Sequence, residues 1–474
     1  MKRMLVAVTA LFALAVLPVA AHAEGDVYAG FPVTLKGYEG SATTSVSYGG
    51  QIARQVLHDS LKKLAGKGTG APNAALKAEM TAYFEGKDAG RAIIAPATKG
   101  PFVVKQSGVD ELSKGTNLAG KTYKGAVPGM PNNMTGPELV SFWIDKASAA
   151  EKGFDAANGY DYPRLISKFL LGAVFYNQAV DNYLDEKLRA DNKPNDKPYK
   201  EGAAYTGKEH SWDEAFGYFG APAHTLSLSP QAVYEINKQG SKSEKPEDAL
   251  AHADLNQDGA VDLKSEMAFG PAYYAAGFDK RGTDYLHTIT QAFLDGRKVI
   301  TEANGAALTD EQRSMLQGYA ETIRTNWERV LAEAVFKYAG SVYKDLGKLE
   351  TILESGGDPA KAFRTYAKHW GELKGFALAL QTGRDNLGET AVRLNRIIGF
   401  GPVLPNTSQV TDIDSAGNYV KDESKPLATY QYDMLKLQDL MISAFAVEAR
   451  QNDQLSDMES LLEKLGDGAS AEND

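Results

Sequence analysis

The stretch PRLISKFLLGAVFYNQAVDNYL, residues 163–184, decides the fold class of this chain. Apolar side chains recur in it every three or four residues, which is the period of one helix face. They are Leu165, Phe169, Ala173, Tyr176, Val180 and Leu184. Pro163 stands at the start, where the first turn of a helix tolerates proline. The stretch therefore predicts a long helix with one buried face.

Similar patterns lie on both sides of this stretch. Residues 51–64 carry helical apolar spacing, and Thr135 with Glu138 forms a capping box. Thr309 with Gln312 forms another, Asp358-Pro359 begins a further helix, and residues 430–450 predict a last one. Convincing alternating strands are missing. We therefore predict an all-α fold of two antiparallel helical bundles in series, at residues 47–250 and 271–462.

Polar or extended segments flank these bundles. Residues 24–46 predict an extended lead-in, residues 251–270 a connecting loop, and residues 463–474 a disordered tail. Three further polar segments, 190–205, 238–248 and 403–426, predict loops.

Residues 1–23 have the pattern of a secretory signal peptide. Lys2 and Arg3 precede an apolar run, and Ala21-His22-Ala23 is a small-x-small cleavage site. Removing these 23 of 474 residues leaves 451, with no second long apolar run. We expect a mature chain without a membrane span, in the periplasm or secreted. The signal holds no cysteine, which excludes lipid attachment there.

Composition restricts the ligands and partners. The chain has 51 basic and 61 acidic side chains, a balance of −10. Loss of Lys2 and Arg3 leaves 49 against 61, or −12. Such a chain, with no basic cluster in its sequence, argues against nucleic acid or an anionic membrane as partner. There is no cysteine, so any metal must be held by nitrogen and oxygen ligands.

Two histidine–acid clusters are candidate metal sites. In KEHSWDEAFGYFG, residues 208–220, helical spacing places His210 on one face with Asp213 and Glu214. His369 and Glu372 repeat the spacing of three in the second half. This mixture of ligands suits divalent and trivalent cations, and we predict iron or another transition metal. The alternative for each cluster is a core histidine paired with an acid.

A calcium-like loop stands at the join between the predicted bundles. It runs DLNQDGAVDLKSE over residues 254–266, with glycine at position 6 of the pattern. Its expected ligands are Asp254, Asn256, Asp258, Ala260 through its carbonyl, Asp262 and Glu266. Glu266 arrives one position later than the standard loop requires. We predict a calcium clamp, and the alternative is a metal-free turn.

A family resemblance rests on GGQIARQ, EHSWDEAFGYFG, DLNQDGAVDLKSEMAFG and HWGELKGFALALQ. These segments resemble an uncharacterised family of secreted bacterial proteins that is similar to the imelysins. Imelysins are iron-regulated periplasmic and outer-membrane proteins that are also classed as metallopeptidase-like. The resemblance implies two four-helix bundles and a role in iron acquisition. The imelysin hallmark Gly-x-His-x-x-Glu is altered here, with Gly207 three residues before His210 and Ala367 in the second glycine position.

Three functions follow from these observations. The first is a periplasmic metal-binding protein that serves iron or iron-chelate acquisition, with an outer-membrane receptor or another uptake component as partner. The second is a calcium-stabilised, non-catalytic interaction module. The third is a zinc peptidase, for which the chain has no His-Glu-x-x-His helix and no further residue singled out as a base.

Overall fold

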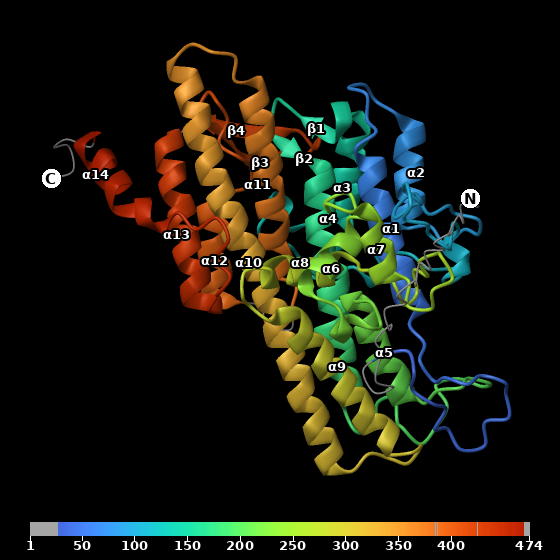
Figure 1. Cartoon of the computed structure of the whole chain (residues 1–474). Helices are drawn as coiled ribbons and strands as arrows, with labels where there is room; N and C mark the ends of the chain where they lie inside the picture. Colours follow the sequence, from blue (N-terminus) through green and yellow to red (C-terminus); the bar gives the residue numbers. More distant parts are fainter. Residues whose placement is uncertain (1–26, 384, 386, 424, 469–474) are drawn as a thin grey trace, which may run out of the picture.

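The computed structural model describes residues 27–383, 385, 387–423 and 425–468 (Figure 1). This part of the chain is mostly helical, as the apolar periodicity predicts. The first seven helices are α1 (Gly49–Ala65), α2 (Ala74–Phe84), α3 (Gly136–Ala149), α4 (Tyr162–Leu170), α5 (Gly207–Phe219), α6 (Pro230–Asn237) and α7 (Pro246–Ala253). They are followed by α8 (Gly270–Asp279), α9 (Tyr285–Glu302), α10 (Asp310–Glu354), α11 (Ala360–Leu380), α12 (Gly388–Ile398), α13 (Leu427–Phe445) and α14 (Met458–Gly468).

The predicted capping boxes begin two of these helices. Thr135 precedes α3 and Thr309 precedes α10, and each box is formed with the acid or amide three residues later. At 45 residues, α10 is roughly 67 Å long at 1.5 Å per residue. It runs the length of the molecule and packs against α9, α11 and α13 (Figure 1).

The helix predicted from residue 163 is confirmed, with a change of winding along it. After α4 the chain continues in π-helical turns, η5 (Leu171–Tyr176) and η6 (Gln178–Tyr183). Almost every side chain from Tyr162 to Tyr183 is buried. Such wider turns are frequent at functional sites.

Helices from the two halves of the chain touch where α4 crosses α11. A Cβ atom on Gly375 would lie 2.5 Å from Lys168 Cβ, and one on Gly172 would lie 2.4 Å from Ala379 Cβ. Glycine at these positions therefore permits the close approach. The buried apolar side chains of both halves form one continuous core.

Two short antiparallel hairpins interrupt the helical pattern. One pairs β1 (Phe154–Asp155) with β2 (Tyr160–Asp161), and the other pairs β3 (Ser408–Ile413) with β4 (Tyr419–Glu423). The second lies in the segment that we expected to be a loop. Asp414 closes its turn by accepting hydrogen bonds from the N–H groups of Ala416 and Asn418.

The predicted C-terminal helix ends earlier than expected, at Phe445. Ala446 takes a left-handed backbone conformation, and the N–H groups of residues 448–450 then donate to the buried carboxylate of Glu333. Residues 463–468, expected in a disordered tail, belong to α14. The expected signal peptide and residues 469–474 lie outside the described residues. Within those residues, no helix has both the length and the apolar character needed to cross a membrane.

Candidate functional site

His210 lies on α5 with its ring between two tyrosines. The ring centres of Tyr199 and Tyr205 are 4.2 and 4.5 Å from its own. Its Nε2 is 3.7 Å from Glu214 Oε1, which also accepts a 2.8 Å hydrogen bond from Gln51. Burial lowers the pKa of His210, and the Glu214 carboxylate opposes that shift. The structure thus brings His210 and Glu214 together, as the sequence analysis predicts for residues four apart on a helix.

Asp213 takes no part in this pair. Its Oδ1 accepts hydrogen bonds of 2.9 Å from Arg297 Nε and 3.0 Å from the Tyr28 hydroxyl. Arg297 also lies 3.2 Å from Glu209, and all three charged side chains are fully buried. The Glu214 side chain turns toward His210, whereas the Asp213 side chain turns toward Arg297. Asp213 instead ties α5 to α9.

The two residues of the second predicted cluster, His369 and Glu372, also contact different partners on different helices. His369 Nδ1 lies 2.6 Å from Asp345 Oδ2 on α10. Glu372, one turn further along α11, lies 3.4 Å from Arg164 on α4. Within the described part of the chain, no three histidine or acidic side chains are grouped in a way that would hold a metal ion. A site for iron or another transition metal at these histidines therefore stays a prediction.

The calcium-like loop has the backbone form that its sequence predicts. Asp254 accepts hydrogen bonds from the N–H groups of Asp258 and Gly259, and Gly259 takes a positive φ of 87°. Glu266 is buried and folds back to accept from the N–H groups of Leu255, at 3.1 Å, and Asp262, at 2.6 Å. The late position of Glu266 therefore does not keep its carboxylate from reaching the loop.

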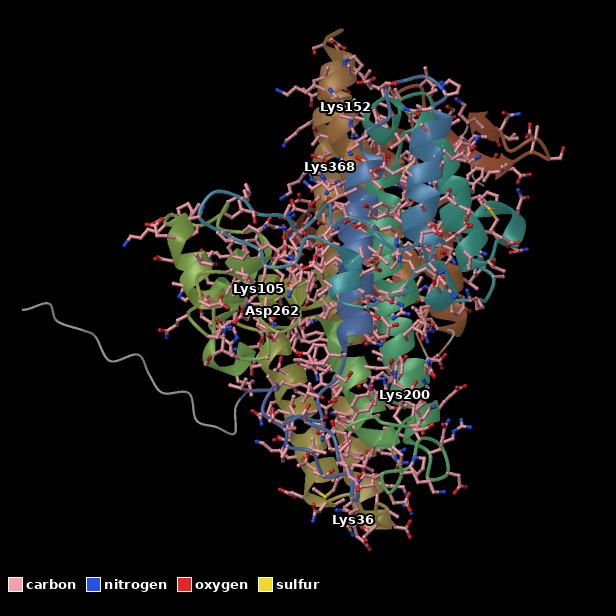
Figure 2. The ribbon with its side chains drawn as sticks, turned by 90° about the vertical axis from the view of Figure 1, so that its right-hand side faces the viewer. Lys36, Lys105, Lys152, Lys200, Asp262 and Lys368 are labelled. Atoms are coloured by element: carbon pink, nitrogen blue, oxygen red, sulfur yellow. The ribbon has the colours of Figure 1, made fainter. Side chains whose placement is uncertain are left out.

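A lysine supplies positive charge to this loop. Lys105 Nζ lies 2.5 Å from Asp258 Oδ2, and the backbone of Val261 pairs with residues 103–105. Figure 2 labels Lys105 next to Asp262 of the loop. The remaining loop acceptors also have protein partners. Asn256 accepts from Asp258 N–H, Asp258 Oδ1 from Ala260 N–H, and Asp262 Oδ1 from the Gln106 amide. A calcium ion in this loop would have to displace the Lys105 ammonium.

The sequence analysis missed a basic cleft at the crossing of α4 and α11. Its larger hollow has a volume of about 670 Å³ and is walled by α1, α4, α6, α8, α10 and α11. Eight basic side chains line it, against three carboxylates, Asp59, Asp161 and Glu372. The basic side chains are Lys62, Lys63, Lys99, Lys152, Arg164, Lys168, Lys238 and Arg364. This surplus contrasts with the acidic balance of the whole chain.

Two of the three carboxylates form ion pairs with arginines, and the third, Asp59, pairs with His58. Arg164 lies 3.4 Å from Glu372, and Arg364 lies 2.7 Å from Asp161. Lys168 is only 4% exposed, and its Nζ makes no hydrogen bond or ion pair with any residue that the structure describes. Burial holds the pKa of Lys168 well below its usual value, and the Lys62 ammonium lowers it further.

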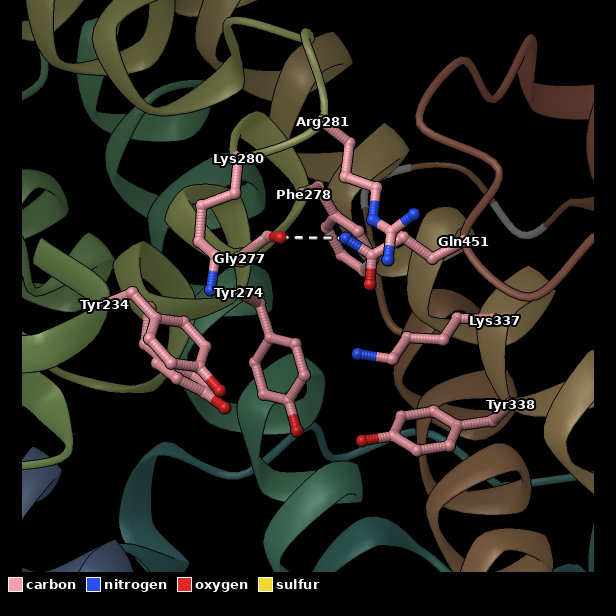
Figure 3. A pocket seen from close by; sticks show the side chains of 10 residues that line it. Tyr234, Tyr274, Gly277, Phe278, Lys280, Arg281, Lys337, Tyr338 and Gln451 are labelled. Atoms are coloured by element: carbon pink, nitrogen blue, oxygen red, sulfur yellow. Dashed lines mark hydrogen bonds between the residues drawn. The ribbon is translucent and has the colours of Figure 1, made fainter. Parts of the chain in front are cut away.

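A second hollow of about 550 Å³ adjoins the first and completes the basic cleft (Figure 3). Tyr273, Tyr274 and Tyr338 line both hollows. The smaller one has three basic side chains, Lys280, Arg281 and Lys337, and no acidic side chain in its lining. Figure 3 shows the Tyr274 and Tyr338 hydroxyls facing each other below the Lys280 and Lys337 amines.

One signal in the sequence pointed to this cleft. Arg164 and Lys168 stand four residues apart within an otherwise apolar helix, where a buried lysine is rare. The other basic residues come from segments far apart in the sequence. Their convergence depends on the packing of α1, α6 and α11 around α4, which no local pattern reveals.

The described part of the chain is thus a mostly helical protein with a cationic cleft made of two adjoining hollows. The chain belongs to the family described as "Domain of unknown function (DUF4856)", whose model matches residues 143–392, more than half of the chain. The matched region includes Lys168, Lys238, His210 and the calcium-like loop. No curated protein and no solved structure matches the chain.

Proposed function

We propose that this protein binds an anionic ligand in the basic cleft and acts as a binding protein rather than through bound metal at its histidines. The observation that carries the proposal is Lys168, a buried side chain that lines the cleft and whose amine makes no hydrogen bond or ion pair with a described residue. Burial of an unpaired charge is costly, so a lysine kept at such a position indicates that its counter-charge arrives with a ligand. Concave hollows of this size are typical of small-molecule sites.

Iron acquisition enters this proposal in the form of a chelate. The histidine clusters do not assemble a ligand set, whereas many metal complexes with carboxylate ligands are anions that a lysine-rich cleft attracts. The predicted signal peptide places the protein in the periplasm or outside the cell. There an outer-membrane receptor or another uptake component would be its partner.

The imelysin-like arrangement of two bundles belongs to the same proposal. Helices α1, α2, α3 and α4 pack on one another, and α10 packs on α11 and α13. The basic cleft lies where these two groups meet, at the contact of α4 with α11. A cleft between two helical units is a common position for a ligand site.

The alternative is a non-catalytic interaction module braced by calcium. The observation in its favour is the calcium-like loop, in which Asp254 and the buried Glu266 both accept hydrogen bonds from backbone N–H groups of the loop. The zinc peptidase rests on the family resemblance alone, because the described residues do not bring three zinc ligands together.

Titration calorimetry of the chain without residues 1–23 tests the main proposal, with inorganic phosphate, citrate and ferric citrate as probes. We expect binding that weakens as salt rises from 20 to about 300 mM, because salt screens charge interactions. Lys168→Met and Lys238→Met should each lower affinity at least about tenfold, since a lost charge-assisted contact is worth about 1.5–3 kcal/mol. The exposed Lys36, far from the cleft, provides the control Lys36→Met (Figure 2). Equal binding by all variants would contradict the proposal.

A further inference from the structure

We infer that the natural ligand of the basic cleft is an acidic oligosaccharide, a chain of sugar rings that carries carboxylate, sulfate or phosphate groups. This inference rests on the proposed anion binding and narrows it to one chemical class. Three features of the cleft carry it: the two hollows share three tyrosines in their linings, both contain lysine amines without ion pairs to described residues, and the lining also offers carboxylates and neutral hydrogen-bonding groups.

The adjoining position of the two hollows argues for an extended ligand. Both are lined by Tyr273, Tyr274 and Tyr338, so a ligand that occupies both would lie against these tyrosines. Each hollow alone, at about 550 and 670 Å³, already lies in the range that holds one small molecule. A single phosphate or citrate would fill only a small part of the cleft.

Lysine amines occupy both ends of the basic cleft. Lys280 and Lys337 line the smaller hollow, where their amines project toward its centre (Figure 3). Lys62 and Lys63 on α1 line the larger hollow. None of these four amines has an ion pair with a described residue. A ligand that satisfies both ends must carry at least two separated negative groups.

The lining between the two ends requires a ligand with hydroxyl groups. Carboxylates of Asp59 and Glu372 line the larger hollow, and they can only accept hydrogen bonds when ionised. An anionic chain without hydroxyl groups would have nothing to donate to these carboxylates, whereas sugar hydroxyls between the charged groups donate to them. Sugar hydroxyls also accept from the Tyr273 hydroxyl and the Gln239 amide, both in the same lining.

Calorimetry with the chain lacking residues 1–23 tests the inference with two charged probes. These are a hexamer of galacturonic acid and a heparin-derived hexasaccharide. The comparison probes are galacturonic acid monomer, a neutral maltohexaose and ferric citrate. We expect at least one charged hexasaccharide to bind ten or more times more tightly than the monomer and ferric citrate, and maltohexaose not to bind.

Variants at each end of the basic cleft distinguish one extended binding site from two independent small sites. Lys280→Met/Lys337→Met and Lys62→Met/Lys63→Met should each weaken hexasaccharide binding at least tenfold, while Lys36→Met leaves it unchanged. If monomer or ferric citrate binds as tightly as both hexasaccharides, the inference is overturned and anion binding stands. If none of the anions binds, the proposed function fails as well.

Discussion

Lys168 Nζ lies 5.0 Å from the centre of the Tyr274 ring and 5.7 Å from that of Phe376, and it makes no hydrogen bond or ion pair with a residue that the structure describes. A cation over an aromatic ring gains about 0.5–2 kcal/mol, less than the desolvation of a buried ammonium costs. The lysine is therefore retained at the expense of stability. This relationship links the fold of α4 directly to the basic cleft.

Replacement of Lys168 by methionine should stabilise the protein and at the same time weaken anion binding. Methionine has a similar length and no charge, so Lys168→Met should raise the free energy of unfolding of the ligand-free protein by about 1–3 kcal/mol. The same variant should lose affinity for anions. Urea unfolding checks the first result and calorimetry the second. A variant that is less stable than the parent, with unchanged binding, would assign Lys168 a structural role only.

A second buried lysine should make stability depend on pH. Burial lowers the pKa of Lys374 to about 7, against about 10.4 in an unfolded chain, and its Nζ donates to the Gly399 carbonyl at 2.7 Å. Between these two values the unfolded state binds more protons. Stability should therefore rise with pH from about 7 to 10, by up to about 1.4 kcal/mol per pH unit from this group.

Urea unfolding at pH 7, 8 and 9 measures that slope. Lys374→Met should remove the contribution of this group, whereas Lys36→Met should leave the slope as in the parent. Lys168, whose pKa is also lowered, contributes in the same direction, so Lys168→Met should reduce the slope too. A slope that all variants share would show that neither lysine titrates differently on unfolding.

The two acids on α5 should differ sharply on mutation. Asp213→Ala leaves Arg297 buried with only Glu209 as a charged partner, and removal of one partner from a buried ion cluster costs about 3–5 kcal/mol. Glu214→Ala removes a partner from His210 and Gln51 at a partly exposed position, and should cost about 1 kcal/mol. Thermal unfolding of both variants checks this order. A smaller loss for Asp213→Ala than for Glu214→Ala would contradict it.

The helices could be predicted from the sequence where the residues that indicate them lie close together along the chain. Capping residues such as Thr135 and Thr309 act within one turn, and the apolar spacing from Leu165 to Leu184 describes one face of one helix. The partners of the candidate ligands were not predictable in this way. Asp213 meets Arg297, which is 84 residues away, and Glu372 meets Arg164 on another helix.

The same distinction explains the missed hairpin and the close packing of α11. Gly371 and Gly375 lie against α4, where a Cβ atom would meet Arg164 or Lys168. Residues 408–423 form paired strands with only two fully apolar inward positions, Val410 and Ile413, too few for a clear alternating signal. Helix crossings and short hairpins are decided by tertiary contacts rather than by local pattern.

Calcium should compete with a lysine at the calcium-like loop. Lys105 lies against Asp258, so an entering cation must displace an ammonium group, which weakens binding. We expect calcium at about 1–10 mM to raise the thermal midpoint of the chain, in line with extracellular sites whose dissociation constants are about 0.1–1 mM. Lys105→Ala should make the same rise occur at lower calcium concentrations.

Glu266→Gln, which removes the charge of a buried carboxylate from the loop, should abolish the calcium-dependent rise of the thermal midpoint. Magnesium serves as the matched control ion, because it demands a smaller octahedral site. A midpoint that calcium leaves unchanged in both the parent and Lys105→Ala would make this loop a metal-free turn held by Lys105.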